Sequence, residues 1–208
     1  MYSLVGKVFE QKSNISLDSI YQERLFNPLG MEDASVTYEG MKDAENRATP
    51  HIFRRYWKPT PITKKYYNAI PAGGVNASIS DMAQWLQLLL GNREDVIKEE
   101  TLDKIFSSHV NTHNRRKYFS KWRGVKESHY GLGWRIVKRE NDTLIYHGGY
   151  VNGFKSEILM NRKDKVAICV LTNAPSQLSS IAIPTFINKY DHYRELIMSW
   201  DPNEKPVL

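Results

Sequence analysis

A histidine followed by two glycines, His147-Gly148-Gly149, lies in the apolar stretch IYHGGYVNGFKSEILMNRKDKVAICVLTN. Glycine adopts conformations and allows close approaches that other residues cannot, so a surface turn would account for the two glycines. A turn does not account for the histidine, whose imidazole can gain or lose a proton near neutral pH. The triplet is the first candidate for chemistry in this chain. The structural alternative is a histidine held in a sheet by a backbone carbonyl.

Two other side-chain patterns carry weaker signals. His109 and His113 are four residues apart, the spacing of two metal ligands on one helical face, but no third ligand accompanies them and a surface loop is favoured. The single cysteine, Cys169, lies in an apolar run and is expected to be a buried small hydrophobe. A lone cysteine excludes an intrachain disulfide. The sequence therefore predicts neither a metal nor another cofactor.

Composition indicates a globular protein. The chain has 208 residues, of which 41% are hydrophobic and 12% aromatic, enough for a core in one large domain or two small ones. Its net charge of +6 comes from basic residues dispersed along the chain. Dispersal is typical of solvated loops and argues against a nucleic-acid partner, which would need a clustered basic face. No apolar run approaches the about 20 residues that a transmembrane helix needs.

Hydrophobic periodicity predicts helices in the first half of the chain. A helix is entered at Met1, and a second one is capped by Ser16. A third is capped by Ser80 and Asp81 and is stopped by Gly91. Residues 32–68 have no sustained period and are expected to form an extended loop region. The predicted helical ranges are 1–9, 17–25, 82–89 and 99–108.

From Tyr130 the period becomes strand-like, and four strands with short antiparallel connections are expected. A closing helix over residues 181–200 has Pro184 near its first turn. The predicted fold class is α+β, as one domain with a helical part over about 1–128 and a sheet with its closing helix over about 129–200. The predicted strands are 131–137, 143–147, 154–160 and 166–171.

Four segments, taken in order, resemble the later segments of one known family. They are YSLVGKVFEQKS…ERLFNPLGM, PAGGVNASISDMAQWLQLLL, YGLGW and YHGGYVNGFKSEILMNRKDKVAICVLTN. The family is that of the serine β-lactamases and penicillin-binding-protein-like enzymes, in its class C branch, and the resemblance spans essentially the whole chain. It implies an antiparallel sheet flanked by helices, of the β-lactamase and transpeptidase type, lacking the N-terminal part of that fold.

The resemblance also implies roles for residues. Enzymes of this family place a Ser-x-x-Lys, a Tyr-x-Asn loop and a Lys-Thr-Gly or His-x-Gly triad around one cleft. His147 matches the head of the triad, and Gly148 and Gly149 would let a substrate backbone lie against the strand. The amide of Tyr150 corresponds to a donor of the oxyanion hole. The facing loop is expected to border the same groove through Gly73, Gly74 and Asn76.

The nucleophile of the family is not found in these 208 residues, because no Ser-x-x-Lys occurs in the sequence. In family members the Tyr-x-Asn loop sits just ahead of the helix that this chain enters at Met1. The chain is therefore interpreted as the C-terminal portion of a serine hydrolase, inactive alone, whose expected partners are its missing N-terminal half and further copies of itself. The resemblance favours a periplasmic or secreted location.

The substrate is expected to be a small molecule or a peptide that carries a β-lactam, amide or ester carbonyl. Histidine and glycine in place of lysine and threonine remove the ammonium and hydroxyl groups that hold a β-lactam carboxylate, so an esterase, a D-amino-acid peptidase or a peptidoglycan-related hydrolase fits as well. A second class of function stays open. The chain could be a non-catalytic binding or regulatory domain that keeps the fold.

Overall fold

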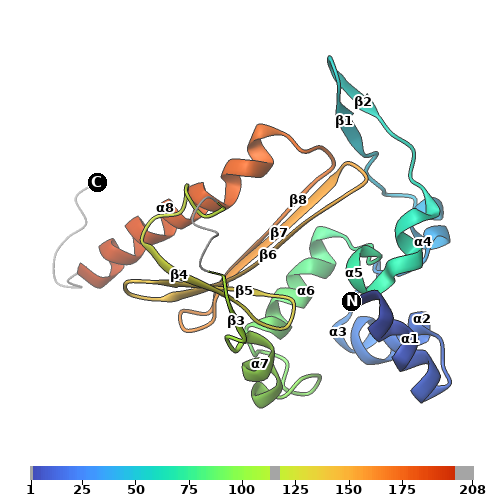
Figure 1. Ribbon diagram of the computed structural model, residues 1–208, viewed down its shortest axis with the longest axis horizontal. Helices are drawn as coiled ribbons and strands as arrows, with labels where there is room; N and C mark the ends of the chain where they lie inside the picture. The colour runs from blue at the N-terminus through green and yellow to red at the C-terminus, as the bar shows by residue number, and fades with distance from the viewer. Residues whose placement is uncertain (1, 113–117, 200–208) are drawn as a thin grey trace.

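The computed structural model describes residues 2–112 and 118–199 as an antiparallel sheet with helices against both faces (Figure 1). The six strands follow one another in the sheet in chain order, each antiparallel to the next, which is a meander. This confirms the predicted α+β class. The strands are β3 (Val110–Asn111), β4 (Val125–Tyr130), β5 (Arg135–Arg139), β6 (Thr143–Val151), β7 (Phe154–Asn161) and β8 (Val166–Thr172).

The four predicted strands correspond to β5 to β8, and two further strands were not predicted. β3 and β4 lie in the part of the chain that the sequence assigned to helices and irregular structure. β4 has the sequence VKESHY, which lacks the apolar–polar alternation that marks a half-buried strand. β6 is also longer than expected, because it continues through both glycines to Val151.

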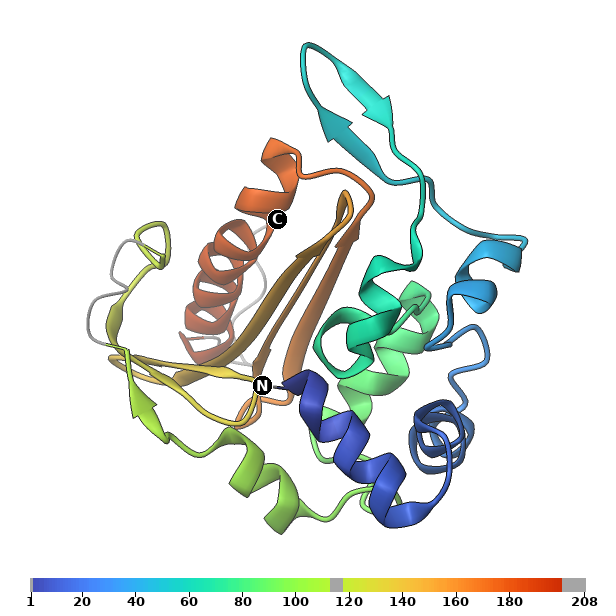
Figure 2. The ribbon, with the colours of Figure 1, turned by 45° about the vertical axis from the view of Figure 1, so that its right-hand side comes forward.

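Successive side chains of β6 enter two different cores, one on each face of the sheet. Ile145 packs with α6 (Ile79–Leu89) and α7 (Glu99–Phe106), whereas Leu144 and Tyr146 pack with α8 (Gln177–Ser199). Figure 2 shows α8 and α6 on opposite sides of the long strands. Leu89, Leu102 and Met160 belong to the first core, and Val137, Leu159 and Ile187 belong to the second.

A third, smaller core holds the N-terminal helices together through Phe26, Leu29 and Leu88. Ser16 caps the second helix as predicted, since its hydroxyl accepts a hydrogen bond from the amide of Ser19. That helix continues as a short π-helix. The bounds are α1 (Tyr2–Ser13), α2 (Leu17–Tyr21), the π-helix η1 (Gln22–Phe26) and α3 (Asn27–Leu29).

Three predictions about helices and loops were wrong. The cap of α6 is Ser78, which forms a capping box with Asp81, so the helix begins two residues earlier than the Ser80 cap implied. Pro184 lies inside α8, because that helix begins at Gln177. Residues 32–68 contain ordered elements, namely α4 (Tyr38–Asp43), β1 (His51–Phe53), β2 (Trp57–Pro59) and the start of the 3₁₀ helix η2 (Lys64–Ala69), which leads into α5 (Ile70–Gly73).

A buried ion-pair network holds α8 to the turn between β5 and β6. The guanidinium of Arg139 donates to both carboxylate oxygens of Asp142 and to both oxygens of Asp191 on α8, at 2.6 to 2.8 Å. Only 8% of the Arg139 side chain and 1% of that of Asp142 are exposed. Arg194 adds a second cation at 3.2 Å from Asp142. Removal of one partner from such a network leaves buried charges without compensation.

We therefore expect Arg139→Ala to lower the free energy of unfolding by about 3 kcal/mol or more, because two carboxylates lose their shared partner. Urea denaturation followed by circular dichroism measures the change. Lys138→Ala is the matched control, since Lys138 is on the same strand but makes only a half-exposed pair with Glu127, and it should cost less than about 1 kcal/mol. Equal losses in the two variants would show that the network does not stabilise the docking of α8.

Candidate active site

Strand β6 is paired on both sides in its first half and on one side in its second half. β5 pairs with residues from Thr143 to Tyr146, whereas β7 continues along β6 to Val151. β5 begins late because the chain before it makes a tight turn, in which Gly133 has φ +85° and the Gly131 amide donates to the Trp134 carbonyl. Among the described residues, no strand pairs with the β5 side of residues 147–151.

The turn that follows β6 decides which amides face this open edge. Asn152 and Gly153 have φ of +48° and +90°, the left-handed conformations of a two-residue type I′ hairpin. Such a hairpin is closed by a hydrogen-bonded pair, here Val151 with Phe154. Since hydrogen bonds alternate along antiparallel strands, the N–H groups of Gly148 and Tyr150 point away from β7, into the open edge.

His147 lies at the head of the open edge, and its side chain is exposed. Its Nδ1 bonds to the carbonyl oxygen of Gly133, and its ring lies edge to face with Trp134 at 5.7 Å between centroids. Because a carbonyl can only accept, Nδ1 carries the proton in the neutral ring. A histidine held in a sheet by a backbone carbonyl was the structural alternative to a site residue, and such a carbonyl is present here. It anchors a ring that is exposed, however, and it leaves the lone pair of Nε2 free to accept a proton.

The two glycines differ in what lies against them. A Cβ atom at Gly148 would be 2.3 Å from the Tyr146 hydroxyl, so a larger residue there cannot be accommodated without movement. A Cβ atom at Gly149 would have Ser156 Oγ as its nearest neighbour, at 3.6 Å, which is an ordinary contact. Gly148 is thus required by packing behind the strand, whereas Gly149 leaves free space on the face that it shares with His147.

A polar cluster supports Gly148 from the α8 side of the sheet. Tyr146 donates to Glu157 Oε1 at 2.7 Å, and the ammonium of Lys155 lies 3.4 Å from that same oxygen. Burial, together with hydrogen bonds to Tyr118 and Glu157, raises the pKa of Tyr146 far above its ordinary value. The phenol therefore stays neutral at all physiological pH values and remains a donor, which fixes its ring beneath the backbone of Gly148.

This cluster forms the floor of a pocket of about 400 Å³ beside the triad. The pocket is bounded by the backbone of Gly148 and Gly149 and by the ring of Tyr150, which is 53% exposed. Tyr118 and Trp122, whose rings contact that of Tyr146, also line the pocket, which lies on the α8 face of the sheet. A pocket with aromatic walls and a few polar groups is typical of sites for small molecules and peptide side chains.

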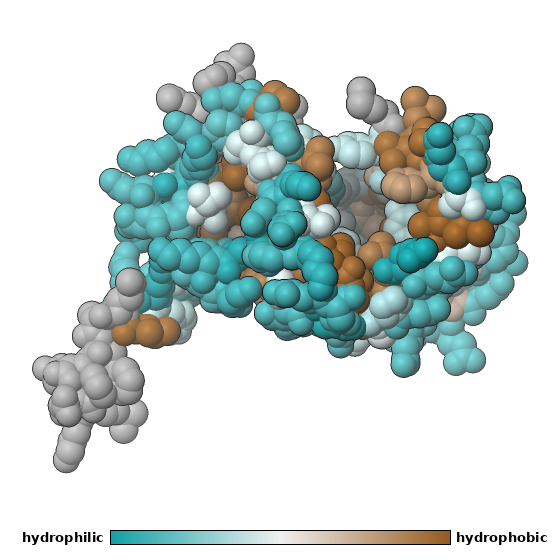
Figure 3. Space-filling view, turned by 90° about the horizontal axis from the view of Figure 1, so that it is seen from below, coloured by the Kyte–Doolittle hydropathy of each residue, from teal (hydrophilic) through white to brown (hydrophobic). Residues whose placement is uncertain are grey.

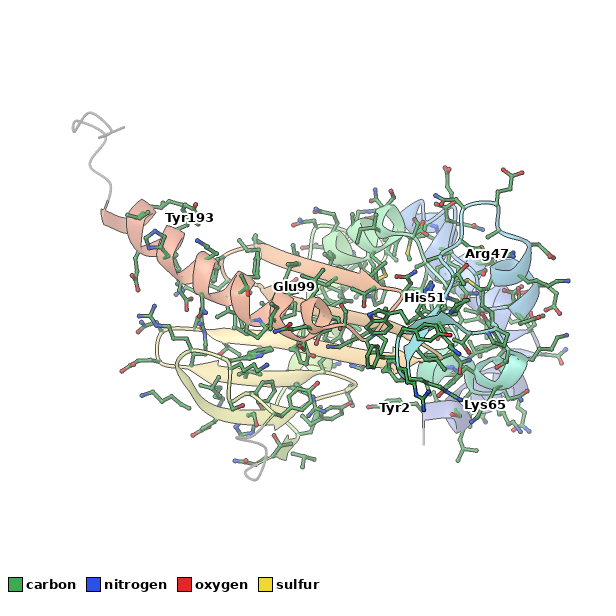
Figure 4. All side chains as sticks on the ribbon, turned by 90° about the horizontal axis from the view of Figure 1, so that it is seen from above. Tyr2, Arg47, His51, Lys65, Glu99 and Tyr193 are labelled. Atoms are coloured by element: carbon green, nitrogen blue, oxygen red, sulfur yellow. The ribbon has the colours of Figure 1, made fainter. Side chains whose placement is uncertain are left out.

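The predicted facing loop does lie beside the far end of β6. A Cβ atom at Gly73 would be 3.3 Å from Cγ2 of Val151. The Val151 side chain lies on the same face of β6 as the His147 side chain and the open space at Gly149. Gly74 is the C-cap of α5 and lies closely against Ile70. A Cβ atom at Gly74 would be 2.7 Å from the Cα atom of Ile70. Figure 3 shows the surface hollowed between two halves of the molecule, and Figure 4 labels Tyr2 of α1, the helix that packs against α5.

Asn76 is occupied by contacts within the protein. Its Nδ2 donates to Ser35 Oγ at 2.8 Å and to the Thr37 carbonyl at 3.0 Å, and its Oδ1 accepts from the Tyr67 hydroxyl at 2.7 Å. Its backbone also pairs with Ser35. Both amide donors are therefore used in holding the loop. The side chain of Asn76 is thus bonded to Ser35, Thr37 and Tyr67 within the protein.

The beta-lactamase family model matches residues 1–185 of the chain. The chain belongs to the beta-lactamase family. A D-aminopeptidase from Gluconobacter oxydans is 22% identical over 88% of this chain, and the chain spans about a third of the length of the curated relatives that it matches.

Two solved structures show the same fold. An octameric penicillin-binding protein homologue from Pyrococcus abyssi superposes with a TM-score of 0.74 at 22% identity, over 90% of this chain and 41% of its own. A mutant class C beta-lactamase superposes with a TM-score of 0.66 at 15% identity, over 91% of this chain and 56% of its own. The family and the fold class implied by the sequence are confirmed.

The other residues singled out in the sequence do not join this site. His109 Nε2 lies 3.1 Å from Ser107 Oγ, and His113 falls outside the described residues. No group of three potential metal-ligating side chains occurs in residues 2–112 and 118–199. Burial raises the pKa of Cys169 to about 11, so its thiol stays protonated and poorly nucleophilic at neutral pH.

Residues that the sequence did not single out complete the geometry. Trp134 and Gly133 hold the His147 ring, and Tyr146 and Glu157 support Gly148. A signal for one of them was present. Glu157 lies two residues after Lys155 on the same face of β7 and is followed by the apolar residues Ile158 to Met160. A carboxylate buried in such a strand needs a hydrogen-bond or charge partner.

We expect Gly148→Ala to destabilise the protein by about 1 to 3 kcal/mol, because the new methyl group overlaps the Tyr146 hydroxyl. Gly149→Ala, one residue away on the same strand, should change the free energy of unfolding by less than about 0.5 kcal/mol. Parallel urea titrations measure both changes. A result in which Gly149→Ala is the more damaging change would contradict the packing described here.

Proposed function

We propose that this chain forms the histidine wall of the active site of a serine hydrolase that acts by acyl-enzyme chemistry. One observation carries the proposal. An anchored but exposed His147 heads an open strand edge into which two backbone amides point. Such an edge can bind the backbone of an extended substrate by strand addition. The amide of Tyr150 would donate to the carbonyl oxygen as negative charge develops on it.

His147 is proposed to act through Nε2. With Nδ1–H held by the Gly133 carbonyl, Nε2 accepts a hydrogen bond from the substrate or from the acyl-transfer groups across the cleft, and it donates one only after it has taken up a proton. Gly149 leaves room for substrate backbone beside it. Gly73 and Gly74, held by Asn76, would form the facing wall near Val151. The nucleophile would come from a Ser-x-x-Lys outside these 208 residues.

A peptide with a D-amino acid is the proposed substrate class. A curated relative is named as a D-aminopeptidase, which supports an amide carbonyl as the reacting group. The histidine triad lacks the ammonium and hydroxyl expected of a dedicated β-lactamase. The pocket walled by Tyr118 and Trp122 would accept an apolar side chain next to the reacting carbonyl. A β-lactam and an ester share the carbonyl chemistry and are the comparison substrates.

Association with another polypeptide is part of the proposal. β8 pairs with β7 only, so its second edge has no strand partner among the described residues, and an unpaired edge favours pairing with another chain. The strand VAICVLT contains no charge or proline that would discourage such pairing. We propose that an N-terminal segment carrying the nucleophile binds there, and that copies of this chain associate in its absence.

The test is acylation by a fluorescent serine-hydrolase probe. The 208-residue chain alone should not be labelled. Its complex with a segment that carries Ser-x-x-Lys and Tyr-x-Asn should be labelled on that segment. His147→Ala should slow labelling about 100-fold or more, because loss of a proton-transfer group typically costs this much. Light scattering of the same samples reports whether the segment replaces self-association.

His109→Ala is the matched control, since this exposed histidine is engaged only with Ser107, and it should leave the rate unchanged. Stoichiometric labelling of a serine within this chain would contradict the proposal that the nucleophile lies elsewhere. Binding of D-peptides by a complex that is never acylated would instead favour the non-catalytic binding domain.

A further inference from the structure

One segment of the chain, outside the proposed histidine strand, has basic residues and no acidic ones. Residues 46–80 contain no aspartate or glutamate and six lysines and arginines, against a net charge of +6 for the entire chain. Along the full sequence the basic residues are dispersed. In the structure, however, three of the six in this segment lie together on the hairpin of β1 and β2. The six are Arg47, Arg54, Arg55, Lys58, Lys64 and Lys65.

The hairpin of β1 and β2 projects from the body of the protein in both ribbon views (Figures 1 and 2). Its last paired residues are Phe53 and Trp57, and the Arg54 amide donates to the Tyr56 carbonyl across the tip. The base is held firmly. The His51 amide donates to the Asn173 carbonyl at 2.7 Å at the end of β8. Residues 53–59 are all exposed.

Three aromatic rings are exposed at this tip. The exposed fractions are 60% for Phe53, 61% for Tyr56 and 41% for Trp57. Two of the rings contact each other, the third contacts a neighbouring cation, and none of the three belongs to a core cluster. Phe53 and Trp57 lie edge to face at 5.3 Å, and the Lys58 ammonium lies 4.6 Å from the centre of the Tyr56 ring. A cluster of exposed aromatic residues of this kind marks an interaction site.

The cations of the tip are available to a partner. Arg54, Arg55 and Lys58 form no salt bridge with any carboxylate of residues 2–112 and 118–199, whereas Lys64 nearby is paired with Glu39 at 2.9 Å. Unpaired cations around exposed tryptophan, tyrosine and phenylalanine match the lipid-water interface, where amphipathic rings lie at the level of the headgroups and cations bind anionic lipids.

We propose that the hairpin tip, residues Phe53 to Lys58, docks on the surface of an anionic lipid bilayer. Trp57 and Phe53 would enter the interface, and Arg54 and Arg55 would bind lipid phosphates. No described helix is long and apolar enough to cross a membrane, and this contact needs none. A single projecting tip with aromatic rings at its end suits a flat interface. A nucleic acid would require cations that follow its backbone along a groove.

The base of the hairpin connects this contact to the open strand edge. A Cβ atom at Gly153 would be 2.8 Å from the carbonyl oxygen of His51, so β1 lies against the turn that ends β6. Docking of the tip would therefore hold the far end of β6 near the membrane surface. The proposal does not depend on the proposed hydrolase chemistry, because the hairpin residues take no part in it.

Sedimentation with lipid vesicles tests the proposal on the full chain. The chain should bind vesicles of equal parts phosphatidylglycerol and phosphatidylcholine and should bind pure phosphatidylcholine far more weakly. Arg54→Ser with Arg55→Ser should weaken binding about 30-fold, at roughly 1 kcal/mol for each of the two cations near the surface. Phe53→Ser with Trp57→Ser should weaken it at least as much. Brominated lipids should quench tryptophan fluorescence, and Trp57→Phe should remove that quenching.

Lys189→Ser with Tyr193→Ser is the matched control, since it removes one cation and one exposed ring from α8. Tyr193, 58% exposed, lies at the other end of the molecule (Figure 4). Circular dichroism of each variant establishes that it is folded. Binding that is unchanged in both hairpin variants, or equal loss in the α8 control, would overturn the proposal. Tighter binding to single-stranded DNA than to anionic vesicles, lost in the arginine variant, would assign the hairpin to nucleic acid instead.

Discussion

The difference in length between two neighbouring strands determines the rest of the site. β5 begins only at Arg135, so β6 loses its partner on that side after Tyr146 and continues with β7 alone. His147 and the amide of Tyr150, which are proposed to act on the substrate carbonyl, both lie on the unpartnered part. The turn at Gly133 both delays β5 and supplies the carbonyl that holds His147. One local conformation therefore exposes the strand edge and orients the imidazole at its head.

An unpartnered strand edge is useful for catalysis only if it is rigid, and the opposite face of the sheet provides the support. Tyr146 lies directly behind Gly148 and is held by Glu157 on the next strand. At the other end, the type I′ turn fixes the register of β6 against β7. The network around Arg139 holds α8 over the same face. Rigidity of the edge thus comes from buried polar contacts as well as from the cores.

The sequence predicted the parts of this fold that depend on local pattern. A strand-like period indicated β5 to β8, and the family resemblance, together with the two glycines after His147, singled out the candidate triad. Contacts that depend on register could not be predicted. Tyr146 meets Glu157 only because β6 and β7 pair with a particular offset, and Asn76 meets Ser35 across 41 residues. β4 and the hairpin were missed because their burial does not alternate: every residue of β2 is exposed, and β4 has consecutive residues in the same burial class.

The central claim is that the amides of Gly148 and Tyr150 point into an open edge while those of His147, Gly149 and Val151 bond to β7. Amide hydrogen exchange, measured residue by residue by nuclear magnetic resonance, tests it directly. The account predicts protection that alternates along residues 147–151, with fast exchange at Gly148 and Tyr150, and continuous protection over residues 144–146, which are paired on both sides. A Tyr150 amide as protected as that of Gly149 would contradict the account, because that amide could not serve a substrate carbonyl.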